Sequence, residues 1–270
     1  MSFGFLFTPY FFMTLLLAFV QSATEFLPVS SSAHLILCQS FGFTDRGIFS
    51  DVAMHAGTLL AVIIYFKKDL WCMFKNMLKG GDDTRLMRNL IIATIPILIS
   101  GVVGITIISR LRSPIVIGGT SIIFGFILWV TDKISFTGTN SDLRTMTIWD
   151  ALCIGLAQLL ALVPGVSRSG ICITCCRALG FNRRESTRFA MLLSIPTISA
   201  ASVYIFLLAH RDHLLNQLLT FNVLLGTFLS AILGLIVIKF LMAWIKHASF
   251  AVFALYRIAL GIFVLNYFLF

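Results

Sequence analysis

The sequence predicts an all-α polytopic membrane protein with about six full spans and two re-entrant helix pairs in an inverted-topology repeat. Three observations support this prediction. Apolar residues make up 59% of the chain and charged residues 11%, against about 45–50% and about 25% in an ordinary soluble domain. Two short polar segments interrupt long apolar stretches. The two halves of the chain also share identical residues at a fixed offset.

The composition leaves no part of the chain for a soluble domain. A length of 270 residues accommodates about six to eight spans of about 20 residues, so we expect 1–270 to form a single membrane domain. The net charge is +9, but Lys and Arg cluster in short loops. This is typical of topology signals and lipid contacts, and we expect no nucleic-acid binding. Residues 1–20 lack a basic start and a cleavage site, so no removable signal peptide is expected.

The first apolar region is broken by a polar segment. Residues 9–27 and 35–43 are apolar, and the first polar island, residues 21–34, carries Pro28 and three consecutive serines between them. Irregular backbone at membrane depth is tolerated only where it is buried in protein or lines a wet cavity. We therefore predict a re-entrant helix–loop–helix over 9–43. Pro28 should end the first helix and place the serines in a turn that opens the second.

Further along, apolar segments alternate with basic ones. Six segments are expected to cross the membrane fully: 52–66, 90–108, 115–131, 189–209, 223–240 and 250–270. The segment 67–88 holds six Lys and Arg residues and is predicted to be a cytoplasmic loop. Counting from it places both termini outside and the polar residues 132–147 inside. The turn 110–114 then lies outside, although its arginines mildly breach the charge rule.

A second broken region follows at 148–176. The second polar island, Pro164–Gly170, interrupts it, and an arginine cluster at 177–188 marks its return to the inner side. We predict a second re-entrant pair. Ordinary spans at 9–27 and 148–163 would also fit the hydropathy, but they would put one arginine cluster on the wrong face.

The two halves repeat at an offset of 137 residues. Ten of the forty positions 15–54 are identical to their counterparts, and the serine islands fall at equivalent points. The identical pairs include Gln21 with Gln158, Ser30 with Ser167, and Ser32 with Ser169. By the count of basic residues, the two halves, 1–131 and 148–270, enter the membrane from opposite faces. The prediction is an inverted repeat whose broken helices meet near the bilayer midplane.

The residues of the two islands suggest a phosphate site. Glu25 follows Gln21 by four residues, so both lie on one helix face. Serines at a helix start, with its free N–H groups, favour an anion. The second island adds a guanidinium, whose fork of donors suits phosphate. These island residues are Ser30, Ser31, Ser32, Ser167, Arg168, Ser169 and Gly170. Glu25 and His34 would then supply a base, a nucleophile, an acid or a metal ligand.

Structural interpretations compete with each of these. Serine clusters often only join helices, and Glu25 could serve a transporter as an ion or proton site. Arg168 could neutralise Glu25, and His34 could be a packing residue. His55, at the start of a span, is expected to be structural, and the arginines of 177–188 topology markers. The sequence Cys172-x-x-Cys175-Cys176 lacks a second ligand pair for zinc, so we expect packing residues there.

The two islands resemble the signatures of a known family. Gln21-x-x-x-Glu25-Phe-Leu-Pro-Val-Ser-Ser-Ser-Ala-His34 resembles the first signature of the bacterial undecaprenyl-diphosphate phosphatases of the bacitracin-resistance type. Pro164-Gly-Val-Ser-Arg-Ser-Gly170 resembles the second, and similarity extends to 155–158 and 189–196.

The resemblance implies a function and a location. The expected reaction removes the terminal phosphate of undecaprenyl diphosphate, a C55 polyprenyl diphosphate, and recycles the lipid carrier for cell-wall synthesis. It implies bacitracin resistance, with bacitracin competing by binding the substrate. It also implies a multi-pass protein of the bacterial inner (plasma) membrane whose site opens toward the periplasmic side. Membrane lipids are expected contacts, and a homodimer is left open.

The resemblance also implies residue roles. Glu25 is the key acidic residue, Ser31 the nucleophile or a phosphate ligand, His34 the motif histidine and Arg168 the phosphate-binding arginine. A divalent cation, Mg²⁺ or Ca²⁺, is expected near Gln21 and Glu25. The expected phosphate-binding residues are Ser30, Ser32, Ser167, Ser169, Gly170 and Thr174.

The chain departs from the family pattern at three positions. Gln21 stands where Glu is often found, Ala33 where Gly is usual, and Cys172 where Thr is common, which would move a hydroxyl contact to Thr174. With one carboxylate fewer, phosphate oxygens would have to supply more of the metal ligands.

The preferred mechanism has Ser31 attack while Glu25 takes its proton and His34 assists as acid or orienting group. The nucleophile could also be His34 or a water. Two other classes stay open. One is a transporter or flippase for an anionic polyprenyl lipid, since inverted repeats with broken helices occur in transporters. The other is the second lipid phosphatase superfamily, which has a Pro-Ser-Gly-His motif. Residues 28–34 resemble that motif only faintly.

Overall fold

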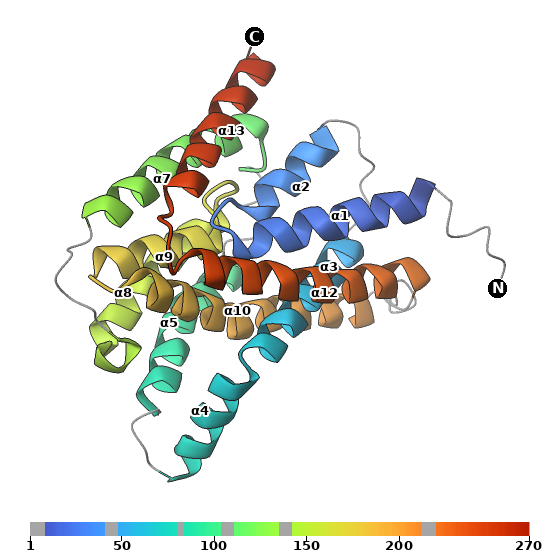
Figure 1. Cartoon of the computed structure of the whole chain (residues 1–270). Coiled ribbons are helices and arrows are strands. Elements are labelled where there is room, and N and C mark those ends of the chain that lie inside the picture. The colour runs from blue at the N-terminus through green and yellow to red at the C-terminus, as the bar shows by residue number, and fades with distance from the viewer. Residues whose placement is uncertain are drawn as a thin grey trace.

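The computed structural model describes residues 9–40, 48–79, 84–103, 111–134, 142–211 and 220–269. These residues form α-helices and two short 3₁₀ helices and contain no β-strand, which confirms the all-α class (Figure 1). The elements are α1 (Pro9–Phe26), α2 (Ser31–Ser40), α3 (Ile48–Tyr65), α4 (Lys67–Lys79), α5 (Thr84–Val103), α7 (Pro114–Ile134), η2 (Leu143–Thr145), α8 (Ile148–Gln158), η3 (Leu159–Leu162), α9 (Arg168–Ala178), α10 (Arg183–Arg211), α12 (Phe221–Trp244) and α13 (Ala251–Leu269).

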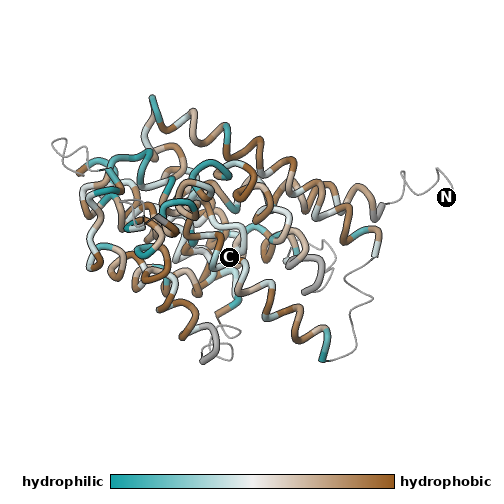
Figure 2. The backbone as a smooth tube through the Cα atoms, turned by 90° about the horizontal axis from the view of Figure 1, so that it is seen from below, coloured by the Kyte–Doolittle hydropathy of each residue, from teal (hydrophilic) through white to brown (hydrophobic). Residues whose placement is uncertain are grey.

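Four of the described helices, α7, α10, α12 and α13, are long and apolar enough to cross a membrane. Large apolar side chains cover their outer faces: Phe126, Phe206, Phe228 and Leu255 are each more than half exposed. Figure 2 shows hydrophobic residues along most of the helical body. Only a hydrocarbon phase accommodates so much exposed apolar surface. The protein is therefore a multi-pass membrane protein, and the number of full spans stays a prediction.

Both polar islands break their helices where the sequence predicts. In the first island α1 ends at Phe26 and α2 begins at Ser31, and in the second η3 ends at Leu162 and α9 begins at Arg168. Each break follows from a proline, which lacks the N–H that a helix interior needs. The turn residues Val29, Ser30, Val166 and Ser167 are buried, so the irregular backbone lies inside protein. Residues 41–43 of the predicted first pair lie outside the described residues.

The two turns have the same geometry. Ser30 and Ser167 are the two described residues other than glycine with positive φ, at 78° and 72°, and they lie 137 positions apart. Ser30 Oγ accepts from the Ala33 N–H at 3.4 Å, and Ser167 Oγ accepts from the Gly170 N–H at 3.1 Å. Each hydroxyl also lies 3.2 Å from the hydroxyl of the serine two residues further along the chain, Ser32 or Ser169. The sequence repeat therefore corresponds to a repeated backbone turn.

Helix pairs follow the same offset. α1 packs against α12, and their counterparts α8 and α5 pack against each other; α7 and α13, which are counterparts, run side by side. The contact between α7 and α13 is close, because a methyl group on Gly261 would lie 2.5 Å from the Gly118 carbonyl oxygen. Small residues of this kind let membrane helices approach. The inverted topology itself stays a prediction.

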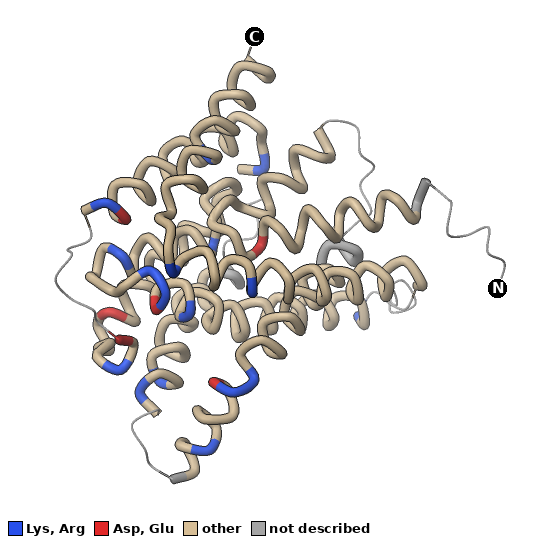
Figure 3. Tube along the Cα trace, in the orientation of Figure 1, with Lys and Arg blue, Asp and Glu red and all other residues tan. Residues whose placement is uncertain are grey.

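The segment 67–88 is not the loop that the sequence predicts. Most of it is helical, because α4 continues to Lys79 and α5 begins at Thr84. α4 carries lysines together with exposed Trp71, Phe74 and Leu78. Mean hydropathy hides such an amphipathic pattern, and a helix of this kind suits a membrane interface. Figure 3 shows many of the Lys and Arg residues on α4, at the start of α5 and where α7 and α9 end and α10 begins, whereas α1 and α2 carry none.

Some of the predicted topology arginines form a buried ion cluster. Asp132, at the end of α7, is 4% exposed. It accepts from Arg177 Nε at 3.2 Å, from Arg183 Nε at 2.8 Å and from the Phe250 N–H at 3.0 Å. One carboxylate thus joins α7, α9, α10 and the start of α13. Arg188 in turn pairs with Asp69, so these arginines have structural partners as well as positive charge.

Asp132→Asn is expected to destabilise the fold strongly. Two guanidinium groups would lose their buried counter-charge, which typically costs about 3–5 kcal/mol. The measurement is the free energy of unfolding in detergent. The matched control is Asp142→Asn, since Asp142 is half exposed and its pair with Arg144 spans 3.7 Å. That change should cost less than about 1 kcal/mol. Equal stabilities of the two variants would refute the role of Asp132.

Candidate active site

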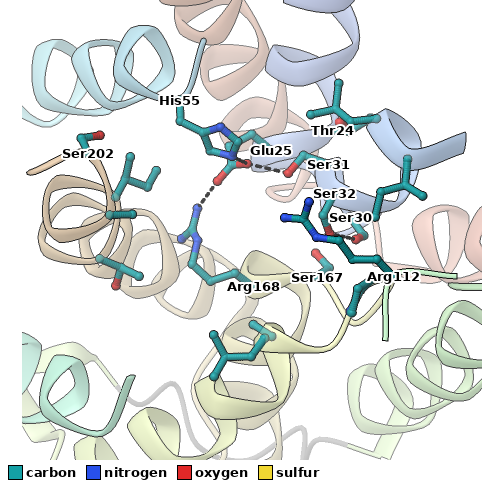
Figure 4. A pocket seen from close by; sticks show the side chains of 18 of the residues that line it. Thr24, Glu25, Ser30, Ser31, Ser32, His55, Arg112, Ser167, Arg168 and Ser202 are labelled. Atoms are coloured by element: carbon teal, nitrogen blue, oxygen red, sulfur yellow. Dashed lines mark hydrogen bonds and ion pairs between the residues drawn. The ribbon is translucent and has the colours of Figure 1, made fainter. Parts of the chain in front are cut away.

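A cavity of about 420 Å³ opens between the two polar islands (Figure 4). Its polar lining comes from both islands, from α2, α3 and α10 and from the turn before α7. The polar residues are Thr24, Glu25, Ser30, Ser31, Ser32, Gln39, His55, Arg112, Ser167, Arg168, Thr197 and Ser202. Apolar residues of α2 and α10 line another part, among them Leu35, Ile36, Ile198 and Ile205. The cavity therefore combines a charged region with an apolar one.

Glu25 is the centre of the polar region. It lies in the last turn of α1 and is 7% exposed. Its Oε2 accepts from Ser31 Oγ at 2.6 Å and from Gln21 Nε2 at 3.2 Å, and its Oε1 accepts from Arg168 Nη2 at 2.8 Å. His55 Nε2 lies 3.6 Å from Oε2. Side chains from α1, α2, α3 and α9 thus meet at one carboxylate.

Ser31 and Arg168 are equivalent residues of the two halves. Each is the first residue of the helix that follows its turn, and they lie 137 positions apart. Each contacts one of the two oxygens of Glu25. Arg168 also donates from Nη1 to the Ala190 carbonyl at 3.1 Å. The N-termini of α2 and α9 therefore converge, and their free N–H groups and dipoles favour an anion between them.

Arg257 holds the two turns together, and the sequence analysis missed it. It lies on α13 and is 1% exposed. Its Nη2 donates to the carbonyls of Gly165 and Val166, both at 2.8 Å, and its Nη1 donates to the Pro28 carbonyl at 3.4 Å. One signal was available in the sequence, because an arginine within an apolar span usually has a dedicated partner.

His34 lies behind the first turn and does not line the cavity. Its Nδ1 lies 2.7 Å from the Ser30 carbonyl oxygen and its Nε2 lies 2.6 Å from the Tyr256 hydroxyl. The two rings also stack, with centroids 5.7 Å apart. This arrangement suits an orienting role for His34. His55, which the sequence analysis took as structural, is instead the histidine beside Glu25, brought there by the packing of α3.

The predicted phosphate ligands divide into two groups. Ser30, Ser32 and Ser167 line the cavity. The others lie behind it: Ser169 Oγ donates to the Leu27 carbonyl at 3.2 Å, the Gly170 N–H donates to Ser167 Oγ at 3.1 Å, and Thr174 Oγ1 donates to the Gly170 carbonyl at 2.7 Å. The second group supports the turn and joins it to the first island.

The residues around Glu25 fit a divalent cation only in part. No group of three His, Cys, Asp or Glu occurs in the described ranges. Gln21 Oε1 is buried without a hydrogen-bond partner, while both Glu25 oxygens already accept hydrogen bonds. Mg²⁺ is often held by one or two carboxylates together with substrate phosphates. The donor set fits a cation that phosphate oxygens help to hold. Cys172 and Cys176 are buried in the apolar core, as predicted.

The sequence profile of the family described as bacitracin resistance protein BacA matches residues 14–263. The chain belongs to this family. It is 41% identical to the undecaprenyl-diphosphatase of Alcanivorax borkumensis over 93% of this chain and 96% of that protein. It is 40% identical to the undecaprenyl-diphosphatase of Desulforudis audaxviator over 94% and 96%, and 37% identical to that of Nocardioides over 93% and 94%. The BacA family is the one whose signatures the two islands resemble.

Gly165→Ala is expected to distort the second turn. Gly165 has a φ of 91°, and an added methyl would overlap the Thr120 hydroxyl. The left-handed conformation alone costs a residue with a side chain about 1–2 kcal/mol. The control is Gly119→Ala in α7, where a methyl meets nothing within 4 Å and should stabilise by about 0.5–1 kcal/mol. Unfolding in detergent measures both changes, and a Gly165→Ala protein as stable as the control would contradict this account.

Proposed function

We propose that the protein hydrolyses undecaprenyl diphosphate, a C55 polyprenyl diphosphate, to undecaprenyl phosphate and inorganic phosphate. The observation that carries this proposal is the contact of Ser31 and Arg168 with the two oxygens of Glu25 at the cavity. A hydroxyl, a base and a guanidinium are the groups that phosphoryl transfer to a serine requires. The names of the relatives supply the substrate.

The two regions of the cavity match the two parts of such a lipid. The diphosphate lies against Ser30, Ser32 and Ser167, where hydroxyls and helix N-termini supply donors. The first prenyl units contact the apolar side chains of α2 and α10. A volume of about 420 Å³ is typical of a small-ligand site, so the rest of the C55 chain extends into the bilayer.

Ser31 is the proposed nucleophile. Its Oγ lies 2.6 Å from Glu25 Oε2, within the reach of a nucleophile and its general base. Ser31 Oγ bonds to the terminal phosphorus, its proton passes to Glu25, and the bond from that phosphorus to the bridging oxygen breaks, releasing undecaprenyl phosphate. Glu25 passes this proton to the leaving undecaprenyl phosphate. Water then attacks the phosphorus of the phosphoserine and gives a proton to Glu25, the bond from that phosphorus to Ser31 Oγ breaks, Ser31 Oγ takes the proton back from Glu25, and phosphate leaves.

The other groups at the cavity stabilise charge and geometry. Arg168 stabilises the charge that develops on the phosphoryl oxygens, and His34 orients the turn through the Ser30 carbonyl. Direct attack by a Glu25-activated water uses the same carboxylate. Attack by His34 has less support, because His34 does not line the cavity and both of its ring nitrogens already have partners.

A divalent cation, Mg²⁺ or Ca²⁺, is part of the proposal. The diphosphate oxygens would hold it together with Glu25, and Gln21 Oε1 is the nearby oxygen without a partner. When bound, the cation supplies positive charge that offsets the phosphate charges. The residues of this chain would position it.

We propose a topology with about six full spans and two re-entrant pairs, with 1–131 and 148–270 as inverted halves. The equivalent turns at Ser30 and Ser167 support the repeat. The basic residues around α4 support a cytoplasmic location for that end (Figure 3). The cavity then opens toward the periplasmic side of the inner membrane.

In this location the activity recycles the lipid carrier for cell-wall synthesis. It also confers bacitracin resistance, because bacitracin competes for the same diphosphate. A transporter for an anionic polyprenyl lipid is the second candidate function, since broken helices at equivalent positions occur in transporters. A transporter has no need of the short contact between Ser31 and Glu25.

The purified protein in detergent should release phosphate from a C55 or C15 prenyl diphosphate with Mg²⁺ or Ca²⁺, and EDTA should stop the release. Glu25→Gln should lower kcat by about 10²–10⁴-fold, the usual contribution of a general base, and Arg168→Ala by about 10²–10³-fold, the usual effect of losing one charge-stabilising group. Arg144→Ala is the matched control, because Arg144 is 83% exposed. Folded protein that binds the lipid but releases no phosphate would favour the transporter.

A further inference from the structure

The turn before α7 brings a second arginine to the cavity. Arg112 lines it together with Ser30, Ser32 and Ser167. In Figure 4 the Arg112 guanidinium points past these serines into the cavity, apart from Arg168 and Glu25. This is one of the residues whose charge breaches the topology rule. A contact with a phosphate of the substrate would explain the positive charge of Arg112, which the topology rule does not explain.

The position of Arg112 is fixed relative to the islands. Ser113 accepts at Oγ from the Val116 N–H at 3.2 Å and so caps the start of α7. One turn further on, Thr120 Oγ1 donates to the Pro164 carbonyl at 2.8 Å. The residue that precedes the cap is thereby held against the second island.

The charge balance of the cavity depends on Arg112. Arg168 is paired with Glu25 and also bonds the Ala190 carbonyl, so these two charges cancel. In the described part of the chain, no hydrogen bond or ion pair engages the exposed Arg112 side chain. A phosphate monoester carries a charge of about −1.5 to −2 at pH 7, and a diphosphate spreads more charge over two groups. Arg168 alone does not neutralise this charge, and the divalent cation proposed beside Glu25 offsets only part of it.

Resting on the proposed function, we propose that Arg112 binds the phosphate that stays on the prenyl chain, while Arg168 binds the phosphate that is transferred. Ser31 and Arg168 both contact the Glu25 carboxylate, whereas the Arg112 guanidinium lies apart from Arg168 in the cavity (Figure 4). Arg112 therefore acts in substrate binding and contributes little to the chemical step. Its guanidinium fork suits phosphate oxygens better than an ammonium group does.

This division predicts a distinct kinetic result for Arg112→Ala. KM for a C15 prenyl diphosphate and Ki for the C15 monophosphate product should rise by the same factor, about tenfold for a lost charged hydrogen bond. The reason is that substrate and product share the lipid-linked phosphate. kcat should stay within about threefold, because Arg112 binds the substrate and the transition state equally, so its loss leaves the barrier from the bound substrate unchanged. Arg112→Lys should recover part of the affinity.

Inorganic phosphate is the third probe. It resembles the transferred group, so its Ki should be unchanged in Arg112→Ala and raised in Arg168→Ala. Arg144→Ala, with the same loss of charge at an exposed site, should leave all three constants unchanged. Unaltered KM and product Ki in Arg112→Ala would overturn the proposal, as would a fall in kcat equal to that of Arg168→Ala.

Binding can be measured without turnover. Calorimetry with a prenyl methylene-bisphosphonate, which is not hydrolysed, should show about tenfold weaker binding to Arg112→Ala than to wild type. If wild type hydrolyses nothing but this difference is present, the proposed hydrolysis fails while the Arg112 subsite stands. If wild type hydrolyses and the difference is absent, the subsite fails alone.

Discussion

The contact of one buried carboxylate with two helix N-termini is the interaction on which the rest of the structure depends. Glu25 lies in an apolar helix, where an unpaired charge costs about 2.5–3.5 kcal/mol or more. Its partners Ser31 and Arg168 come from different halves of the chain. They reach it because α2 begins at Ser31 and α9 begins at Arg168, and both helix starts line the cavity. The breaks, the repeat and the cavity are therefore parts of one arrangement.

That arrangement requires two strained turns, and Arg257 holds these turns together. Ser30 and Ser167 adopt positive φ, which costs about 1–2 kcal/mol each for residues with side chains. Arg257 offsets this strain by donating to carbonyls of both turns. Arg168 thus joins the halves through a carboxylate and Arg257 joins them through the backbone. Donors fixed in this way need little rearrangement when charge develops on a phosphate, which is the main requirement of electrostatic catalysis.

The sequence predicts the parts of the site whose residue types are unusual in an apolar segment. A proline, clustered serines, a carboxylate and a guanidinium are costly in apolar segments, so both breaks and the convergence of Glu25 with Arg168 could be predicted. The places of His55 and Arg112 at the cavity and the particular carbonyl partners of Arg257 could not, because each arises from packing with residues far along the chain. α4 was missed because averaging over a window removes its 3.6-residue period. His34 matched the motif, but its contact with Tyr256 depends on tertiary structure.

A double-mutant cycle tests the central claim that the Glu25–Arg168 pair joins the two halves into one site. Glu25→Gln, Arg168→Gln and the double variant would be unfolded in detergent, and their free energies of unfolding compared with that of wild type. The account predicts that each single change costs about 3–5 kcal/mol, because a buried charge is left alone. The double change should cost less than their sum by at least about 1 kcal/mol. Additivity within about 0.5 kcal/mol would show that the two residues act independently, and would contradict the account.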